Sequence, residues 1–373
     1  MENDFLYEHY QRQLPLKNFG LEAQVKLQHA NVLVIGLGGL GCPAIQYLSA
    51  IGIGHIGIMD GDTVSLSNLH RQILYTYQDI GQLKTSVVEK KILGLNPSTK
   101  ITLYNDYITQ QNAFDIISNY DIILDCTDNF KARYIINDVC YLLNKPLVFG
   151  AVFQYEGQVS IFNHGKDAVN YRDLFPYSPK ENESPNCMQT GVYNIATGVI
   201  GTLQASEAIK LITGIGETLT NKLLTFHSLN ISFYAIDLTK NKLSSKEIPL
   251  SRSEFESYHY DQFCGINSSL SDDISAEEFD QLIQSDDVQI IDIRNENELP
   301  KINNFQSIQI PLASLHENIH LLDKQKKIIL FCHSGIRTQT AIELLHDDYQ
   351  ISNVSHLKGG IIKWLDFKSK KND

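Results

Sequence analysis

Short, wholly apolar runs alternate along the first half of the chain with segments whose apolar residues recur at helical spacing. Residues 31–35 (NVLVI) are an apolar, β-branched run, typical of a strand buried on both faces. The segment GLGGLG follows at 36–41, and residues 43–49 are predicted to be a helix with proline in its first turn. A second strand, residues 55–59, stops at Asp60. This order predicts a strand, glycine loop, helix and strand with an acidic residue at the far end.

The alternation continues over the following hundred residues. Helices are predicted at 85–95 and 134–143, and strands at 100–104, 122–125 and 146–150. Such alternation predicts an α/β fold: a Rossmann-like, mostly parallel sheet with helices on both faces.

The chain then changes character before that first unit ends. Strands at 158–162 and within 223–236 are expected to be antiparallel, and residues 197–213 are a helix that ends at a glycine. Residues 163–186 are rich in Pro, Asn, Ser and charge, which predicts a long loop across the active site.

A second, smaller α/β unit is predicted at the C-terminal end. Residues 274–283 are amphipathic and predict a helix, while residues 288–292 and 327–331 are apolar strand patterns. The segment CHSGIR follows the second of these strands, and a helix is predicted from Thr338. We expect a first domain at 1–240, a Ser-, Lys- and Asp-rich linker at 241–273, and a second domain at 274–373.

Composition and charge exclude several functional classes. The 31 lysines and arginines stand against 43 aspartates and glutamates, giving a formal net charge of −12, which disfavours nucleic-acid and anionic-membrane binding. Six cysteines in 373 residues, none in a C-x-x-C pair, are not a disulfide scaffold. The N-terminus has no basic region followed by an apolar run, so we predict no signal peptide and a soluble, cytoplasmic protein.

The glycine segment is a candidate nucleotide site. Gly36, Gly38 and Gly41 match the G-x-G-x-x-G fingerprint, in which glycine lets a phosphate group approach the amides of a helix N-terminus. Asp60 at the end of the next strand is the expected partner of a ribose hydroxyl. Alone, this pattern favours NAD or FAD over other nucleotides, and a glycine turn required only for packing is the alternative.

The residues after Asp60 favour phosphoryl chemistry instead. Arg71 and Lys84 lie soon after it, and fixed cations stabilise the charge that builds on phosphates during nucleophilic attack. Asp125 and Asp128 follow a further strand, where open α/β sheets bind ligands, and a carboxylate there is suited to Mg²⁺.

Together these motifs resemble the ThiF/MoeB/HesA family, the bacterial relatives of ubiquitin-activating enzymes. The resemblance rests on GLGGLG, on DGDTVSLSNLHRQ at 60–72, on the lysine that follows and on DCTDNF at 125–130, and it covers residues 5 to 240. It implies a homodimer that binds ATP and Mg²⁺ and adenylates the C-terminal Gly-Gly carboxylate of a ubiquitin-like sulfur carrier. By position it assigns phosphate contacts to Arg71 and Lys84, nucleotide contacts to Gly36, Gly38, Gly39, Gly41, Asp60, Asn68 and Gln72, magnesium to Asp128, and a contact in the partner protomer's site to Arg12.

The same resemblance raises two questions about cysteines. Some family members use a cysteine at the position of Cys187 for a covalent carrier intermediate; the alternative is an ordinary loop thiol. Many members also hold a structural zinc with two C-x-x-C pairs. Here Asp173 stands where a cysteine is often found and Cys264 is single, so four ligands cannot be assembled and no structural zinc is predicted.

The C-terminal unit resembles rhodanese sulfurtransferases over residues 274 to 368. Cys332 joins a strand to a helix, where amides and the helix N-terminus favour a thiolate, and Arg337 is expected to fix the loop. Four residues separate the two, one fewer than in cysteine phosphatases, which suits a terminal sulfur rather than a phosphate. Asp292, Arg294, His356, Gly359, Gly360 and Trp364 match further rhodanese landmarks. A degenerate docking module is the alternative.

These resemblances predict an ATP-dependent adenylyltransferase with a fused sulfurtransferase. Its substrate is expected to be a MoaD- or ThiS-like carrier, and its sulfur source a persulfide donor such as a cysteine desulfurase. Molybdopterin synthesis is favoured over thiamine synthesis because rhodanese fusions of this order resemble the eukaryotic MoeB-like proteins. The alternatives are a ThiF-like enzyme that adenylates another substrate such as tRNA, an NAD-dependent oxidoreductase, and a non-catalytic carrier-docking scaffold.

Overall fold

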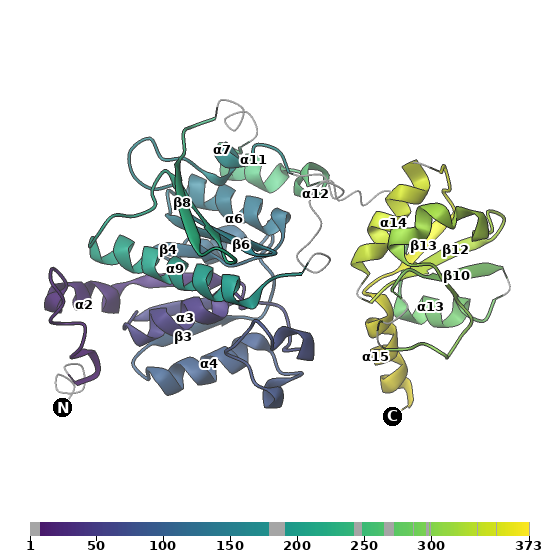
Figure 1. Ribbon diagram of the computed structural model, residues 1–373, viewed down its shortest axis with the longest axis horizontal. Helices are drawn as coiled ribbons and strands as arrows, with labels where there is room; N and C mark the ends of the chain where they lie inside the picture. The colour runs from purple at the N-terminus through teal and green to yellow at the C-terminus, as the bar shows by residue number, and fades with distance from the viewer. Residues whose placement is uncertain are drawn as a thin grey trace. The chain divides into compact units, whose positions relative to one another are not determined.

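The chain folds into two compact units, Met1–Cys264 and Gly265–Asp373, as a computed structural model shows (Figure 1). The structure describes residues 8–178, 191–241, 248–264, 272–285, 287–295, 298, 300–333, 335–347 and 349–372. Within these residues, no helix is long and apolar enough to cross a lipid bilayer.

The first unit is built on an eight-stranded sheet in the order β3-β2-β1-β4-β5-β6-β7-β8. The first five of these strands are parallel, and β6, β7 and β8 continue the sheet antiparallel, as the sequence predicted. The strands are β1 (Asn31–Ile35), β2 (His55–Met59), β3 (Lys100–Tyr104), β4 (Ile122–Asp125), β5 (Leu147–Phe153), β6 (Glu156–Phe162), β7 (Lys222–His227) and β8 (Ser232–Asp237).

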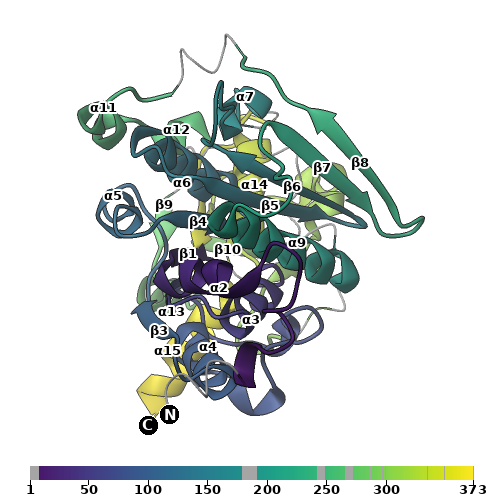
Figure 2. The same ribbon diagram turned by 90° about the vertical axis from the view of Figure 1, so that its left-hand side faces the viewer.

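Helices cover both faces of this sheet (Figure 2). Helices α3 and α9 pack together against one face, and α5 and α6 form a pair on the other. The helices are α2 (Gly20–His29), α3 (Gly41–Ala50), α4 (Lys84–Leu95), α5 (Ala113–Ile117), α6 (Phe130–Leu142), α7 (Tyr171–Leu174), α9 (Asn194–Thr213), α11 (Arg252–Ser257) and α12 (Tyr260–Phe263), with short 3-10 helices η1 (Leu66–Asn68) and η2 (Tyr77–Asp79).

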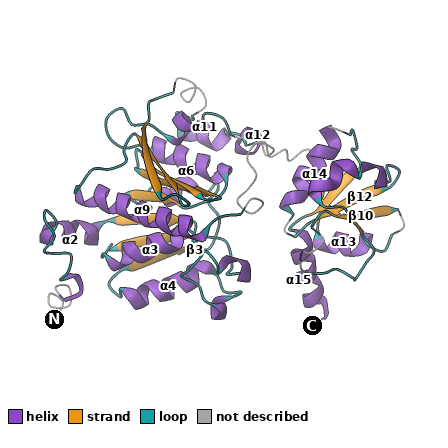
Figure 3. Cartoon of the chain, viewed as in Figure 1, coloured by secondary structure: helices purple, strands orange, loops and turns teal. Residues whose placement is uncertain are grey.

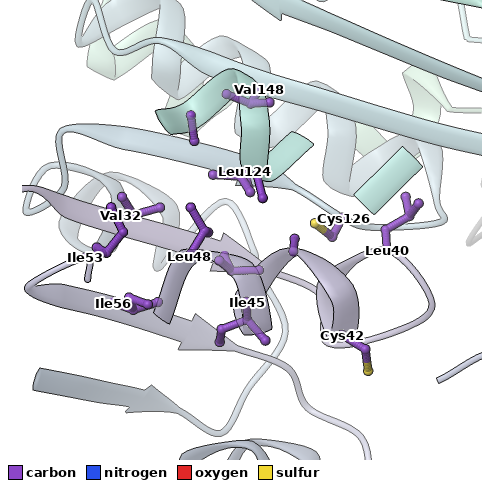
Figure 4. Packing of buried hydrophobic residues seen from close by; sticks show 14 of the residues in the cluster. Val32, Leu40, Cys42, Ile45, Leu48, Ile53, Ile56, Leu124, Cys126 and Val148 are labelled. Carbon is purple, nitrogen blue, oxygen red and sulfur yellow. The ribbon is translucent and has the colours of Figure 1, made fainter. Parts of the chain in front are cut away.

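The core between α3 and the sheet explains why the first strands are apolar throughout. Ile45 and Leu48 of α3 pack with Val32 and Ile56 of the parallel strands and with Leu124 of β4 (Figure 4). All five side chains are fully buried. Side chains on the opposite face of each strand are buried too, because helices cover both faces of the sheet.

The second unit is a five-stranded parallel sheet, in the order β11-β10-β12-β13-β9, with helices on both faces (Figure 3). Alternate residues of β12 face opposite ways: Ile328 and Leu330 pack toward α14, whereas Ile329 and Phe331 pack with α13 and α15. The elements are β9 (Asp272–Ile274), α13 (Ala276–Leu282), β10 (Val288–Asp292), β11 (Ile308–Gln309), η3 (Leu312–Glu317), η4 (Ile319–Leu321), β12 (Lys327–Phe331), α14 (Ile336–Asp347), β13 (Val354–Leu357) and α15 (Gly360–Asn372).

The structure corrects the predicted linker and the start of the second unit. Residues 252–264, expected in the linker, form α11 and α12 and bury Phe255 and Tyr260 against the first unit. Aromatic side chains in an otherwise polar segment supply the apolar area that holds it there. Residues 272–274 pair with β13 as a strand, so the helix predicted from 274 begins at Ala276.

A buried ion pair fixes α12 to the first unit. Arg172 donates to both carboxylate oxygens of Asp138, at 2.9 and 2.7 Å, and the Tyr260 hydroxyl donates to Asp138 Oδ2 at 2.7 Å. Neither charged side chain is exposed at all, and the Arg172 guanidinium also lies over the rings of Tyr134 and Phe263. Each charge is therefore stabilised by these protein partners and not by water.

We expect Asp138→Asn to destabilise the first unit strongly. Breaking a buried pair leaves an uncompensated charge, which typically costs about 3–5 kcal/mol. Urea unfolding would measure this loss, with Asp261→Asn as the matched control because the Lys131–Asp261 pair is half exposed. If the two variants unfold at the same urea concentration, Arg172–Asp138 does not anchor this region.

Candidate functional site

The glycine loop between β1 and α3 is shaped by close backbone contacts, both within the loop and with Cys126 just after β4. Gly36 has a φ of 93°, and a Cβ there would lie 2.7 Å from the carbonyl oxygen of Cys126. A Cβ on Gly41 would lie 2.0 Å from the Gly36 oxygen. Gly36 is therefore required by its positive φ and by its packing against Cys126, and Gly41 by the packing within the turn itself.

The middle of the loop is less crowded. A Cβ on Gly39 would touch Thr197 of α9 at 3.0 Å, whereas one on Gly38 would meet only the Gln72 amide at 3.7 Å. In the first turn of α3, Cys42 N–H donates to the Gly38 carbonyl at 3.0 Å, Ala44 N–H donates to the Leu40 carbonyl at 3.2 Å, and Pro43 has no N–H. Among the described residues, the amides of Gly38, Gly39 and Gly41 make no such bond, so these are the groups available to an anion. This is the arrangement that a phosphate-binding loop needs.

Asp60 stands directly beside this loop and is only 8% exposed. Its Oδ2 accepts from Leu37 N–H and its Oδ1 from Asp62 N–H, both at 2.8 Å. Burial raises the pKa of Asp60, while the Lys84 ammonium, 3.7 Å from Oδ2, opposes that shift. Asp60, the residue predicted to bind the ribose, therefore also holds the glycine loop in place.

Lys84, the first residue of α4, is a buried cation between two carboxylates. It is 4% exposed and donates to Asp62 Oδ2 at 2.7 Å. Burial alone raises the pKa of Asp62, but the charge and hydrogen bond of Lys84 and the hydrogen bond from the Tyr107 hydroxyl lower it below the ordinary value. Lys84 is not a solvated surface charge.

Arg71, Gln72 and Asn68 lie together on and after η1. The Asn68 side chain caps η1 by accepting from Ser65 N–H at 3.2 Å, and Arg71 Nη1 donates to the Ser67 carbonyl at 3.0 Å. Gln72 is 3% exposed, and its Oε1 has no hydrogen-bond partner among the described residues. Its amide lies next to Gly38, so this segment reaches the glycine loop.

The carboxyl end of β4 carries the predicted magnesium residues. Asp125 is 1% exposed, and its Oδ1 accepts from the amide and hydroxyl of Thr127 at 2.9 and 2.6 Å. Its Oδ2 is buried with no partner among the described residues, and burial raises its pKa. Asp128 is exposed. One free buried carboxylate oxygen and one exposed carboxylate fit a magnesium ion that also binds phosphates.

Three features of the first site were not singled out from the sequence. Arg133 of α6 lies close enough to Asp125 to lower the pKa of that carboxyl, and it donates to the Thr127 carbonyl at 3.0 Å. Burial is the largest cause of the raised pKa of the Tyr107 hydroxyl, and the charges of Asp62, Asp60 and Asp128 raise it further. Gln204 of α9 donates to the Asp125 carbonyl at 2.8 Å. Only the folded chain brings these side chains together, so no local motif marks them.

Arg12 lies away from the site of its own chain. Its neighbour Gln13 donates to the Ile51 carbonyl at 3.0 Å, at the C-terminal end of α3. The glycine loop lies at the other end of this ten-residue helix, about 15 Å away at 1.5 Å per residue. Arg12 is exposed and makes no hydrogen bond or ion pair with the described residues.

The two sequence predictions that concern cysteines involve Cys187 and the positions of Asp173 and Cys264. Cys187 lies outside the described residues. At the positions from which no structural zinc site was predicted, the Asp173 carboxylate accepts from Asn170 N–H at 2.8 Å and from Asn241 N–H at 2.7 Å, and burial raises the pKa of Cys264 to about 11. The described residues contain no cluster of three or more His, Cys, Asp or Glu side chains able to hold a metal.

The second site is the loop after β12. Cys332 is fully buried, and the Gly335 N–H donates to its sulfur at 3.1 Å. Gly335 has a φ of 88°, and a Cβ there would lie 2.9 Å from the Gly359 nitrogen, so this turn also requires glycine. One backbone amide of the turn, that of Gly335, thus holds the Cys332 sulfur.

Arg337 is held by a residue that sequence reasoning missed. Both guanidinium Nη atoms donate to Glu298, each at 2.6 Å, and the pair lowers the pKa of Glu298 to about 2. The hydrogen bond to Glu298 raises the pKa of Arg337, and Cys332 contributes to the same shift. Glu298 lies in an irregular segment, where periodicity gives no signal.

The remaining rhodanese landmarks support the fold around Cys332. Asp292 accepts three hydrogen bonds from the Arg294 guanidinium, at 2.9, 3.1 and 2.7 Å, at the end of the neighbouring strand β10. Trp364 is fully buried on the opposite face of the sheet and donates to Asp280 at 3.1 Å.

Sequence comparison assigns both units. Residues 10–247 match the ThiF family, and residues 275–367 match the rhodanese-like domain. The chain belongs to the ThiF family. Its C-terminal unit is rhodanese-like, as the Cys332 loop indicated.

Relatives of this ThiF family member share both units. It is 35% identical to the adenylyltransferase and sulfurtransferase MOCS3 of Drosophila sechellia, over 95% of this chain and 82% of the relative. It is 36% identical to the probable adenylyltransferase/sulfurtransferase MoeZ of Mycobacterium tuberculosis, over 95% of this chain and 92% of the relative.

Solved structures support the fold of the ThiF unit. Escherichia coli MccB in a crystal with MccA-N7isoASN has a TM-score of 0.57 at 23% identity, over 64% of this chain and 74% of that one. The same enzyme with ATP has a TM-score of 0.51 at 23% identity, over 60% of this chain and 68% of that one. At this identity the likeness is one of fold.

Proposed function

We propose that this protein activates a ubiquitin-like sulfur carrier with ATP and then transfers sulfur to it. The observation that carries the proposal is that one chain contains two sites whose chemistries complement each other. A glycine loop is bordered by Lys84 and by the carboxylates after β4, and a buried Cys332 sits in an amide-lined turn. The nucleotide site would yield an acyl-adenylate, which needs a sulfur nucleophile. The Cys332 site would hold that nucleophile.

In the first step, the C-terminal carboxylate of the carrier attacks the α-phosphorus of ATP. A bond forms from the carboxylate oxygen to phosphorus, the bond to the bridging oxygen breaks, and pyrophosphate leaves. Arg71 and Lys84 stabilise the charge that develops on the phosphates, and the α3 N-terminus binds the phosphate chain. The anchored Asp60 holds the ribose.

Asp128, and Asp125 through its free Oδ2, would hold a magnesium ion, which would neutralise charge at the triphosphate. Arg133 keeps the Asp125–Thr127 turn in position by holding the Thr127 carbonyl. This assignment rests on the unpartnered buried carboxylate oxygen.

In the second step, the terminal sulfur of a persulfide on Cys332 attacks the acyl carbon and AMP leaves. The product is an acyl disulfide between the carrier and Cys332. Attack of the Cys187 thiolate on the Cys332 sulfur breaks the S–S bond and releases the carrier thiocarboxylate. An external thiol then reduces the Cys187–Cys332 disulfide, and a persulfide donor such as a cysteine desulfurase reloads Cys332.

ATP–pyrophosphate exchange tests this proposal. Exchange should require magnesium and a carrier ending in Gly-Gly, with a carrier lacking those two glycines as the control. Exchange with tRNA in place of the carrier would favour the tRNA-adenylating alternative. Nicotinamide reduction without exchange would favour an oxidoreductase, and carrier binding without either reaction would indicate a docking scaffold.

The relatives' names support a role in molybdenum cofactor synthesis more than in thiamine synthesis, because the fusion order matches the MOCS3 proteins. We further propose a cytoplasmic setting, where reducing thiols are available to turn over the Cys187–Cys332 disulfide.

We also propose a homodimer in which Arg12 completes the partner's site, because Arg12 lies about a helix length from its own glycine loop. Inactive Arg12→Ala protein mixed with inactive Asp128→Asn protein should regain exchange activity, since one site of each heterodimer is then intact. Pyrophosphate exchange after subunit mixing is the measurement. Native mass spectrometry controls for mixing; confirmed heterodimers without activity would contradict the role of Arg12.

A further inference from the structure

A chain of hydrogen bonds runs from the surface of the second unit to the Cys332 sulfur. Asp273 Oδ1 lies 2.8 Å from His356 Nε2, and His356 Nδ1 lies 2.8 Å from the Thr338 hydroxyl. The same hydroxyl donates to the Gly335 carbonyl at 2.7 Å, and the Gly335 N–H donates to Cys332 at 3.1 Å. His356 and Thr338 are 2% and 0% exposed.

The number of protons available to this series of hydrogen bonds is fixed. The Thr338 hydroxyl has one proton, and the Gly335 carbonyl can only accept, so that contact uses it. His356 Nδ1 must then donate to Thr338, and Nε2 must donate to the ionised Asp273 carboxylate. Both ring nitrogens carry hydrogen only in the protonated imidazole. All four bonds therefore coexist only when His356 is charged.

A neutral His356 forces a different arrangement. Asp273 retains the Nε2 proton because it carries a full negative charge, so Nδ1 becomes an acceptor. The Thr338 hydroxyl then turns its proton to Nδ1 and releases the Gly335 carbonyl. Gly335 is the residue whose N–H holds the Cys332 sulfur, so this change reaches the reacting atom.

We propose that His356 is a positioning residue for the sulfur-transfer loop, and that its protonation decides whether Thr338 holds or releases Gly335. This inference rests on the sulfur-transfer function proposed for the second unit. The protonated form fixes the Gly335 N–H against the sulfur of Cys332 or its persulfide. The neutral form loosens that turn.

The surroundings of His356 set the pH range of this change. Its neighbours on the flanking strands are Asp273 of β9 and the apolar Leu330 of β12, and Lys358 is paired with Asp273 at 2.7 Å. Burial lowers the pKa of His356, and Asp273 opposes that shift. The released form therefore dominates at neutral pH, and the held form gains as pH falls below about 6.5.

His333, in the Cys332 loop itself, is a further histidine that can titrate in this pH range. The pKa of His333 is also lowered, by burial first and by Arg337 and Arg294, while Glu298 opposes this shift. The experiment is therefore made in His333→Gln protein, so that a change at Gly335 reports on His356.

Nitrogen-15 NMR of the full-length protein tests the inference without requiring activity. Between pH 5 and 8 the Gly335 amide signal should shift with the same midpoint as the His356 ring. Thr338→Val should abolish the Gly335 shift while His356 still titrates, and Thr338→Ser should retain it. His356→Asn should also abolish it, because an amide donates to Thr338 at every pH.

Sulfur transfer from thiosulfate to cyanide at pH 5.5, where the protonated His356 lets Thr338 hold Gly335, gives a second readout. Thr338→Val should slow it about three- to tenfold, the effect of one lost hydrogen bond, and Thr338→Ser should restore it. The inference is overturned if the Gly335 amide signal does not shift as His356 titrates, or if it shifts equally in Thr338→Val protein. Either result overturns it even if sulfur transfer is normal. Coupled titration in a protein that transfers no sulfur would instead refute the proposed function and leave the coupling intact.

Discussion

Cys332→Ala protein should form no carrier thiocarboxylate, yet it should retain carrier-dependent pyrophosphate exchange. The thiol is fully buried in a turn of the second unit, whereas the residues assigned to the phosphate site all belong to the first unit. Adenylation therefore does not need this sulfur, whereas persulfide transfer has no nucleophile without it. Intact mass spectrometry of the carrier resolves the two products, because replacing oxygen by sulfur adds about 16 mass units and the adenylate adduct is larger.

Cys264→Ala is the matched control for this experiment, because Cys264 is another buried thiol but belongs to the first unit. It should form thiocarboxylate normally. Wild-type yield from Cys332→Ala, with the second unit as the sole route for sulfur, would contradict the relay. The rhodanese-like unit would then serve as a docking module, and sulfur would enter through Cys187 or another protein.

Asp128→Asn should lower pyrophosphate exchange by about 10²- to 10³-fold, in the range seen when one electrostatic contact to a transition state is removed. The substitution keeps the size of the side chain and removes its charge. Asp128 is exposed, so the melting temperature should hardly move. Exchange assays over a range of magnesium concentrations would measure the loss and show whether excess metal compensates for it.

Asp237→Asn provides the control, because Asp237 is an exposed carboxylate at the end of the edge strand β8. Its exchange rate should equal that of the wild type. Near-normal exchange in folded Asp128→Asn protein would refute the magnesium assignment at Asp128. Asp125, whose buried Oδ2 has no partner among the described residues, would become the leading candidate.

Together these two variants separate the chemistries of the units. Asp128→Asn removes the acyl-adenylate, so it should also prevent thiocarboxylate formation although its rhodanese-like unit still accepts sulfur from thiosulfate. Cys332→Ala should show the opposite pattern. A variant that loses both partial reactions at once would point to a loss of folding instead.

The sequence by itself determined the order of the elements and the motif residues. Buried parallel strands are apolar throughout, so β1, β2 and β4 are visible as short runs, and Gly41 is fixed by a clash with Gly36 within its own turn. Cys332 and its glycine turn are likewise contiguous in the chain. Such features depend on neighbours within a few residues, and a pattern can record them.

Only the tertiary structure decided which distant side chains meet. Glu298 pairs with Arg337 across 39 positions, Asp273 reaches His356 across 83, and Tyr260 reaches Asp138 across 122. The last contact explains why a segment expected to be a linker folds onto the first unit. Pairing of this kind follows from how strands and helices are stacked, and neither hydrophobic period nor residue spacing carries that information.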